Sequence, residues 1–368
     1  MAVYIYQLMD WPRFIWNHER LSKLSIRVSH HQGRLLGRME RMDPRLQAEA
    51  ILRMLTLEVI HSGETEGDAA PYQEVRSAIA QHLGMEIADG VPSTPAVERM
   101  VGMMLDATQH YQAPLTEERL FDWHKALFPT GFSGARRILT GAWRENLVID
   151  PLQVVSGPTS RQTVRYQAPH SYTLRREMAA FLEWFKTTGN LDPLIAAAIA
   201  HLWFITIQPF EDGNGRITRT ITTMQLARSD DSAQRFYSMS AQIRKERNAY
   251  HDILEKTQAG SLDITDWLEW FLQCLDRAIL ETDQLLTDIL GKARFWEKTA
   301  GMSLNDRQKK MLSHLLEGPE EKLTSSLWAK VTQSSPDTAV RDINDLLHKG
   351  VLIKKAAGGR STCYALAS

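Results

Sequence analysis

The residues best suited to chemistry lie in one glycine-rich segment, 208–219, which has the sequence QPFEDGNGRITR. Gly213 and Gly215 flank an asparagine in a predicted turn, where small residues let backbone N–H groups converge on an anion. Arg216 and Arg219 follow at i and i+3 of a predicted helix, so both guanidinium groups can point at one ligand. Composition and spacing therefore predict an anion site, and a turn with two solvated arginines is the structural alternative.

Asp212 adds a carboxylate directly before this turn. Carboxylate oxygen is a hard ligand, which suits Mg²⁺ when the ion is shared with phosphate groups. The segment as a whole is typical of a polyphosphate site.

Predicted helices surround this segment. The longest apolar run, 194–207, has 14 residues, whereas a membrane span needs about 20, so it predicts a buried core helix. Apolar spacing and capping signals predict further helices at 47–60, 116–128, 174–185 and 267–290. The polar stretch 292–305 lacks periodicity and predicts a domain boundary near residue 300.

One stretch, 152–166, predicts a β-hairpin instead of a helix. Leu152, Val154 and Val155 are expected to face Val164 and Tyr166 across a Gly-Pro turn. The free edge of a lone hairpin can accept an extended peptide, so a docking edge and a plain surface loop are both open.

Residues 209–219 resemble the active-site loop of Fic proteins, H-x-F-x-[D/E]-G-N-G-R-x-x-R, at every fixed position except the first. The flanking stretches 198–207, 236–240 and 250–260 resemble the same family. The resemblance covers roughly residues 100–290. It implies a mainly α fold, in which a Fic-type helical core carries the 152–166 hairpin as a flap.

The resemblance also implies an activity, the transfer of AMP from ATP onto a Tyr, Ser or Thr hydroxyl of a target protein, with Mg²⁺. Asp212 would hold the Mg²⁺, and the target segment would dock on the hairpin. The implied phosphate and adenine ligands are Gly213, Asn214, Gly215, Arg216 and Arg219 for the phosphates, and His251 and Gln258 for the adenine pocket.

The departure from the motif falls on the catalytic position, where Gln208 replaces the family histidine. An imidazole titrates near working pH and takes a proton from the attacking hydroxyl, whereas an amide has no useful basicity. His201 lies two helical turns earlier, about 10 Å of rise away, so it predicts a packed, hydrogen-bonded histidine and no substitute base. Two explanations for Gln208 are open: a deliberate substitution and a natural variant.

A second motif lies far upstream, at the end of the helix predicted for residues 47–60. Ser62 and Glu66 share one helix face at i and i+4, and Gly67 follows as a helix-ending residue. The string resembles the Fic inhibitory motif [S/T]-x-x-x-E-[G/N]. By that resemblance Glu66 would pair with Arg219 and occupy the place of the ATP γ-phosphate, or act as a base for removing AMP.

The predicted organisation has three parts: an N-terminal helical extension with the inhibitory helix (1–100), the Fic core (101–292) and a winged helix-turn-helix (302–368). The last part has 10 Lys and Arg against 7 Asp and Glu, a net charge of +3, which is mild for DNA binding. A wing with Lys354, Lys355 and Arg360 would contact DNA or, alternatively, protein. A catalytically silent nucleotide-binding regulator that acts through this part is the second functional hypothesis.

Overall composition narrows the class of protein. The net charge of −1 argues against a globally basic nucleic-acid binder, and 43% hydrophobic residues support a sizeable core. Two distant cysteines, Cys274 and Cys363, argue against a disulfide scaffold or a zinc site. The first residues lack signal-peptide features, so a cytoplasmic protein without membrane contact is expected, and a homodimer is an open alternative.

Overall fold

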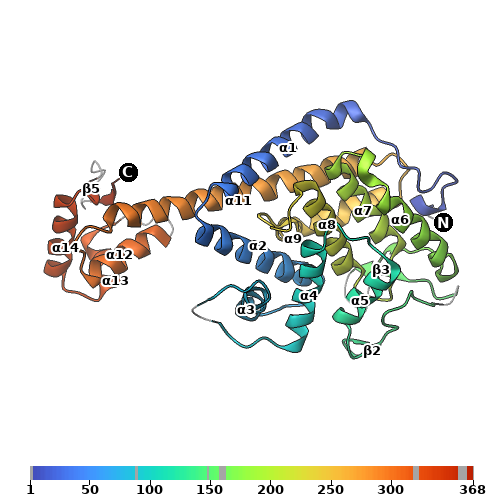
Figure 1. The fold of residues 1–368 in the computed structure, drawn as a ribbon, viewed down its shortest axis with the longest axis horizontal. Helices are drawn as coiled ribbons and strands as arrows, with labels where there is room; N and C mark the ends of the chain where they lie inside the picture. Colours follow the sequence, from blue (N-terminus) through green and yellow to red (C-terminus); the bar gives the residue numbers. More distant parts are fainter. Residues whose placement is uncertain are drawn as a thin grey trace. The chain divides into compact units, whose positions relative to one another are not determined.

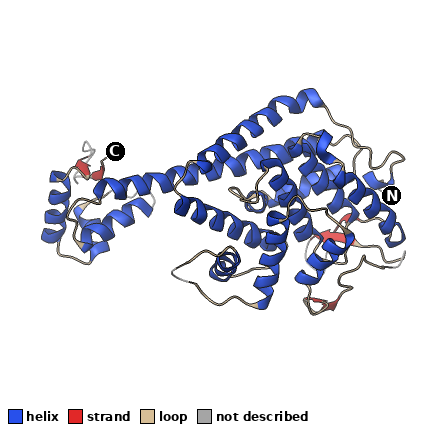
Figure 2. Ribbon diagram, in the orientation of Figure 1, coloured by secondary structure: helices blue, strands red, loops and turns tan. Residues whose placement is uncertain are grey.

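The computed structural model describes residues 3–87, 90–146, 149–156, 163–317, 323–354 and 363–367. It is mainly helical, with three two-stranded antiparallel sheets among the described residues (Figures 1 and 2). The chain divides into two compact units, residues 1–283 and 284–368, and helix α11 runs through the division.

The first unit contains most of the helices. In chain order its elements are η1 (Ile5–Gln7), α1 (His18–Glu40), α2 (Pro44–Thr65), α3 (Tyr72–His82), α4 (Pro95–Gln109), α5 (Glu117–Leu127), β1 (Phe132–Ser133), β2 (Arg136–Arg137), β3 (Gln153–Ser156), β4 (Thr163–Gln167), η3 (Ser171–Thr173), α6 (Leu174–Lys186), η4 (Thr188–Asn190), α7 (Pro193–Ile207), α8 (Asn214–Asp230), α9 (Met239–Lys245), α10 (Arg247–Gln258) and the first part of α11 (Thr265–Thr299).

Helix α7 is the central helix of this unit and packs against α8 (Figure 1). The Asp192 carboxylate caps its N-terminus by accepting the N–H groups of Leu194 at 2.9 Å and Ile195 at 3.3 Å. Every residue from Leu194 to Ile207 is buried. The prediction of a buried core helix is therefore confirmed, and the apolar run is continuous because other elements cover all its faces.

Helix α2 is attached to α8 and α9 through one buried carboxylate. Glu58 accepts hydrogen bonds from the hydroxyls of Thr223 (2.9 Å), Ser238 (2.6 Å) and Ser240 (2.6 Å), and from the Ser240 N–H at 3.0 Å. A buried carboxylate is tolerated where several donors satisfy it. These bonds fix the C-terminal half of α2, which carries Ser62 and Glu66.

Strands β3 and β4 form the predicted hairpin. Val154 pairs with Tyr166 and Val155 with Val164, as expected, with a register shift between the two valines. Tyr166 is buried and its hydroxyl donates to the Thr206 carbonyl at 2.6 Å, which joins the hairpin to the end of α7. The predicted Gly-Pro turn lies outside the described residues.

The second unit contains the remainder of α11 and then α12 (Asp306–Glu317), α13 (Ser325–Thr332), α14 (Pro336–His348), β5 (Leu352–Lys354) and β6 (Tyr364–Leu366). Trp328, Ile343 and Leu346 are buried in its core. This order of three helices and two strands agrees with the sequence-based expectation, while Lys355 and Arg360 of the predicted wing lie outside the described residues.

The largest difference from a predicted helix boundary is at the end of α11. Helix α11 was expected to end at residue 290 and continues to Thr299. The added residues include Lys, Arg, Glu and Ala, which favour helix by intrinsic propensity without any apolar periodicity. Among the described helices, none is both long enough and apolar enough to cross a membrane.

Candidate functional site

The loop between α7 and α8 is held in shape by its own residues. Gln208 ends α7 in the left-handed region, with φ of 49°, and Gly213 precedes α8 with φ of 78°. Asn214 closes the loop, because its side chain accepts the Phe210 N–H at 2.9 Å and donates to the Phe210 carbonyl at 2.8 Å. Helix α8 begins at Asn214, so Gly215 lies in the first helical turn and not in the predicted turn.

Gly213 is required for steric reasons. A Cβ atom there would lie 2.7 Å from Cε2 of Phe128, and the positive φ already disfavours other residues. The close approach of Phe128 also matters for Arg216, whose guanidinium lies 4.9 Å from the centroid of the same ring. The N-terminus of α8 is therefore tightly packed against the end of α5.

His124 packs against the loop and hydrogen-bonds to it. Its ring stacks on Phe210 with centroids 4.1 Å apart, and its Nε2–H donates to the Asp212 carbonyl at 3.2 Å. Nδ1 accepts the Gly141 N–H at 3.1 Å, which fixes the tautomer. Burial lowers the pKa of His124 to about 4, so the ring stays neutral and keeps both bonds.

The Asp212 carboxylate, which the resemblance assigns to Mg²⁺, already accepts two hydrogen bonds. Oδ1 accepts the Gly213 N–H at 2.6 Å, and Oδ2 accepts the Ser133 hydroxyl from β1. Among the described residues no group of three or more His, Cys, Asp or Glu side chains could hold a metal. A single, partly exposed carboxylate fits Mg²⁺, which is commonly held by one or two carboxylates, waters and substrate phosphates.

Arg219 contacts the end of α2, the helix that carries the predicted inhibitory motif. Its guanidinium is 1% exposed, and its Nη2 donates to Glu66 Oε1 at 2.9 Å and to the Ser62 carbonyl at 2.6 Å. Its Nε donates to the Ser62 hydroxyl at 3.1 Å, and Nη1 is buried without a partner. A Cβ at Gly215 would lie 2.0 Å from Glu66 Oε1, so only glycine leaves room for this contact.

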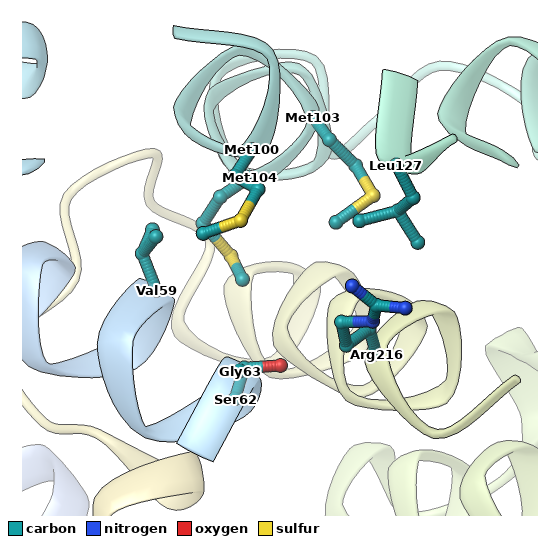
Figure 3. A pocket seen from close by; sticks show the side chains of 8 residues that line it. All are labelled: Val59, Ser62, Gly63, Met100, Met103, Met104, Leu127 and Arg216. Atoms are coloured by element: carbon teal, nitrogen blue, oxygen red, sulfur yellow. The ribbon is translucent and has the colours of Figure 1, made fainter. Parts of the chain in front are cut away.

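Arg216 makes a second ion pair with the same turn. Its Nη1 lies 2.7 Å from Asp68 Oδ2, and its Nε is buried without a partner. Figure 3 shows Arg216 beside the end of α2, at one wall of a small pocket. The pocket lining consists of Val59, Ser62, Gly63, Met100, Met103, Met104, Leu127 and Arg216.

Arg144 holds the backbone of Gln208 in place. Arg144 donates from Nε to the Gln208 carbonyl at 2.7 Å and from Nη2 to the Pro169 carbonyl at 2.5 Å. Burial lowers the pKa of Arg144 to about 10. This buried guanidinium fixes the left-handed residue at the place where the resemblance expects a base.

His201 is a packed histidine, as predicted. It is fully buried, with Nδ1 at 2.9 Å from the Thr222 hydroxyl and Nε2 at 2.8 Å from the Tyr250 hydroxyl. Burial, and to a lesser degree the charge of Arg219, lowers the pKa of His201 to about 3. The ring therefore remains neutral, and it serves packing between α7, α8 and α10.

This depressed pKa predicts acid destabilisation. The unfolded chain binds a proton at His201 below about pH 6.5, whereas the folded chain does not until about pH 3. The free energy of unfolding should fall as pH drops through this window, by about 2 kcal/mol at pH 5 from this group alone. Urea unfolding at pH 7.5 and pH 5 measures the loss, and His201→Gln, which does not titrate, should lose correspondingly less. Equal losses in both proteins would contradict the assignment.

The two residues expected in the adenine pocket both lie on α10. Gln258 is buried and its Nε2 donates to the Thr206 hydroxyl at 3.3 Å. Burial lowers the pKa of His251, and the charges of Arg247, Glu66 and Arg219 also act on it. His251 thus lies within electrostatic reach of the Glu66–Arg219 pair.

Sequence reasoning missed four residues that shape this site: Asp68, His124, Ser133 and Arg144. His124, Ser133 and Arg144 lie 64–88 residues before the loop residues that they contact, in stretches without a recognisable motif. Asp68 follows Gly67 directly, so its place behind the inhibitory motif was an available signal.

Comparison with known families gives two domain matches. Residues 114–226 match the Fic/DOC family, and residues 4–85 match a domain of unknown function (DUF4172). "Protein adenylyltransferase Fic" of Nematostella vectensis is 29% identical over 113 residues, 30% of this chain and 25% of that protein. The protein of the same name from Culex quinquefasciatus is 28% identical over 137 residues, 36% of this chain and 25% of that protein. The chain thus spans about a quarter of the length of these curated relatives.

Solved structures show the same fold. A Fic family protein from Desulfovibrio desulfuricans G20 matches 94% of this chain and 96% of its own, at 20% identity and a TM-score of 0.51. A Fic domain containing signaling protein from Bacteroides thetaiotaomicron matches 69% of this chain and 96% of its own, at 18% identity and a TM-score of 0.51. The mainly helical, Fic-type architecture is confirmed, and the chain contains a Fic domain at residues 114–226.

Proposed function

We propose that this protein is a protein adenylyltransferase, which moves AMP from ATP onto a hydroxyl side chain of a target protein. The observation that carries the proposal is the pair of buried guanidinium groups at the start of α8, Arg216 and Arg219, which both retain an unpartnered N–H. Buried cations at a helix N-terminus suit a polyphosphate. Two curated relatives that match about a third of this chain are named protein adenylyltransferases.

Different residues of the loop would bind different parts of the ATP triphosphate. The backbone of Gly213, Asn214 and Gly215 would contact the α- and β-phosphates, Arg216 the β- and γ-phosphates and Arg219 the γ-phosphate. Asp212 would hold Mg²⁺, which when bound neutralises phosphate charge. The target segment would lie along the β3–β4 hairpin, whose Val154, Val155 and Val164 side chains are exposed.

In the transfer, the target oxygen bonds to the α-phosphorus, the bond to pyrophosphate breaks and the hydroxyl proton needs an acceptor. Gln208 occupies the expected position of that acceptor, and its amide cannot take the proton. We therefore propose that transfer by this chain is impaired, and that Glu66 inhibits it further by occupying Arg219.

A transfer assay tests the proposal. The chain with Glu66→Gly, and the same chain with Gln208→His added, are incubated with Mg²⁺ and ATP labelled at the α-phosphate. Label on protein, with self-labelling or a lysate as target, supports an adenylyltransferase. If neither protein transfers label although both bind ATP, the adenylyltransferase proposal fails.

The second candidate is a catalytically silent regulator that binds nucleotide and reports it through the winged helix predicted at 302–368. Gln208 favours it, because the loop keeps every other fixed residue of the motif while the base is absent. A third candidate, an enzyme that removes AMP with Glu66 as base, predicts release of AMP from a modified target. The assay above separates both candidates from the transferase, because only the transferase places label from ATP on protein.

A further inference from the structure

We propose that Asp68 is a second inhibitory residue, which occupies Arg216 while Glu66 occupies Arg219, so that only a ligand with both a β- and a γ-phosphate displaces both. This inference rests on the proposed nucleotide site. It adds a residue outside the inhibitory motif and a requirement on the ligand, a triphosphate. ADP has the β-phosphate that competes with Asp68 for Arg216, but it has no γ-phosphate to displace Glu66 from Arg219.

The turn after α2 is built to present two carboxylates. The N–H groups of Glu66 and Asp68 both donate to the Gly63 carbonyl, at 2.9 and 3.1 Å, and Gly67 has a φ of 92°. A Cβ at Gly63 would lie 2.9 Å from the Asp68 carbonyl oxygen. The two glycines therefore allow the chain to fold back, which brings Asp68 to Arg216.

The two ion pairs are similar in form. In each, a partly exposed carboxylate meets a buried guanidinium: Glu66 (38% exposed) on Arg219 (1%), and Asp68 (56%) on Arg216 (10%). The distances are 2.9 and 2.7 Å. Because charge-assisted bonds of this length compete directly with phosphate oxygens, each carboxylate excludes one anionic group from its arginine.

Flexible methionine side chains lie beside the end of α2. The pocket beside Arg216 and the end of α2 is lined by Met100, Met103 and Met104, whose flexible side chains can repack (Figure 3). Displacement of both carboxylates needs two phosphate groups in the place of β and γ. AMP carries neither group, so it does not compete with Asp68.

The experiment measures binding, not transfer. Calorimetric titration with ATP, ADP and AMP in Mg²⁺ is performed on the full chain and on Asp68→Asn. The substitution removes the charge that competes with phosphate at Arg216, so ATP and ADP should bind about three- to tenfold more tightly, with AMP unchanged. Asp68→Ala, which also removes the acceptor oxygens, should give at least the same gain.

Glu64→Gln is the matched control. Glu64 lies at the same helix end but pairs with His61 at 2.9 Å and Arg244 at 3.5 Å. The substitution Glu64→Gln therefore removes the same charge as Asp68→Asn without freeing Arg216. Unchanged ATP affinity in Asp68→Asn, or an equal gain in Glu64→Gln or for AMP, overturns the inference. If Glu66→Gly raises ATP affinity in that case, the proposed function stands; if no variant binds ATP, the proposed nucleotide site itself fails.

Discussion

In the chain that carries Glu66→Gly, the further change Gln208→His is expected to raise the rate of AMP transfer by about 10²–10⁴-fold, the usual contribution of a general base. The physical reason is that imidazole accepts the proton of the attacking hydroxyl near working pH, whereas the Gln208 amide does not. The backbone is ready for the exchange, since Arg144 already fixes the carbonyl of residue 208 at 2.7 Å. Label transferred from ATP to protein measures the rate.

The pH profile and one further variant show whether histidine at position 208 acts as a base or only changes the shape of the site. An imidazole base must be neutral, so transfer by the histidine form should rise as pH passes about 6.5 and then level off. Gln208→Asn alters the side chain without adding basicity, and asparagine tolerates the left-handed backbone. A similar gain in Gln208→Asn, or a flat pH profile in the histidine form, would count against a proton-transfer role.

The second large effect is expected from Glu66→Gly alone, which should tighten ATP binding by roughly tenfold. Removal of this carboxylate frees Arg219, whose guanidinium is 1% exposed and keeps an unpartnered Nη1 for the incoming phosphate. Loss of a fully buried charge-assisted bond would give a larger gain in ATP affinity than this. Glu66 is 38% exposed, so solvent screening weakens its bond to Arg219 and reduces the expected gain. Calorimetric titration of both proteins with ATP and Mg²⁺ gives the ratio of dissociation constants.

Glu66→Gln is the informative companion, because it removes the charge and keeps the bulk. If charge alone excludes the phosphate, both variants gain affinity equally; if occupied space contributes, the glycine variant gains more. Space is expected to contribute, since Glu66 Oε1 lies only 2.0 Å from the place that a Cβ of Gly215 would take, against the first turn of α8. Unchanged ATP affinity in both variants contradicts an inhibitory role for Glu66.

The sequence predicted the local parts of this molecule well. The loop, the buried helix α7 and the pairing of Val154 with Tyr166 all follow from residues close together in the chain, where spacing and turn chemistry decide the conformation. The end of α11 was misjudged, because helix propensity continues there after apolar periodicity stops. Gly215 was also assigned to the turn, although the helix already includes it.

The sequence by itself determined which groups could bind phosphate, because the glycines, Asp212 and the two arginines lie within eight consecutive positions, 212–219. Only the tertiary structure decided what these groups contact. Ser62 and Glu66 reach Arg219 across 157 and 153 positions, and Asp68 reaches Arg216. Those contacts depend on the packing of α2 against α8 and α9 through the buried Glu58 carboxylate, and such long-range packing leaves no local pattern in the sequence.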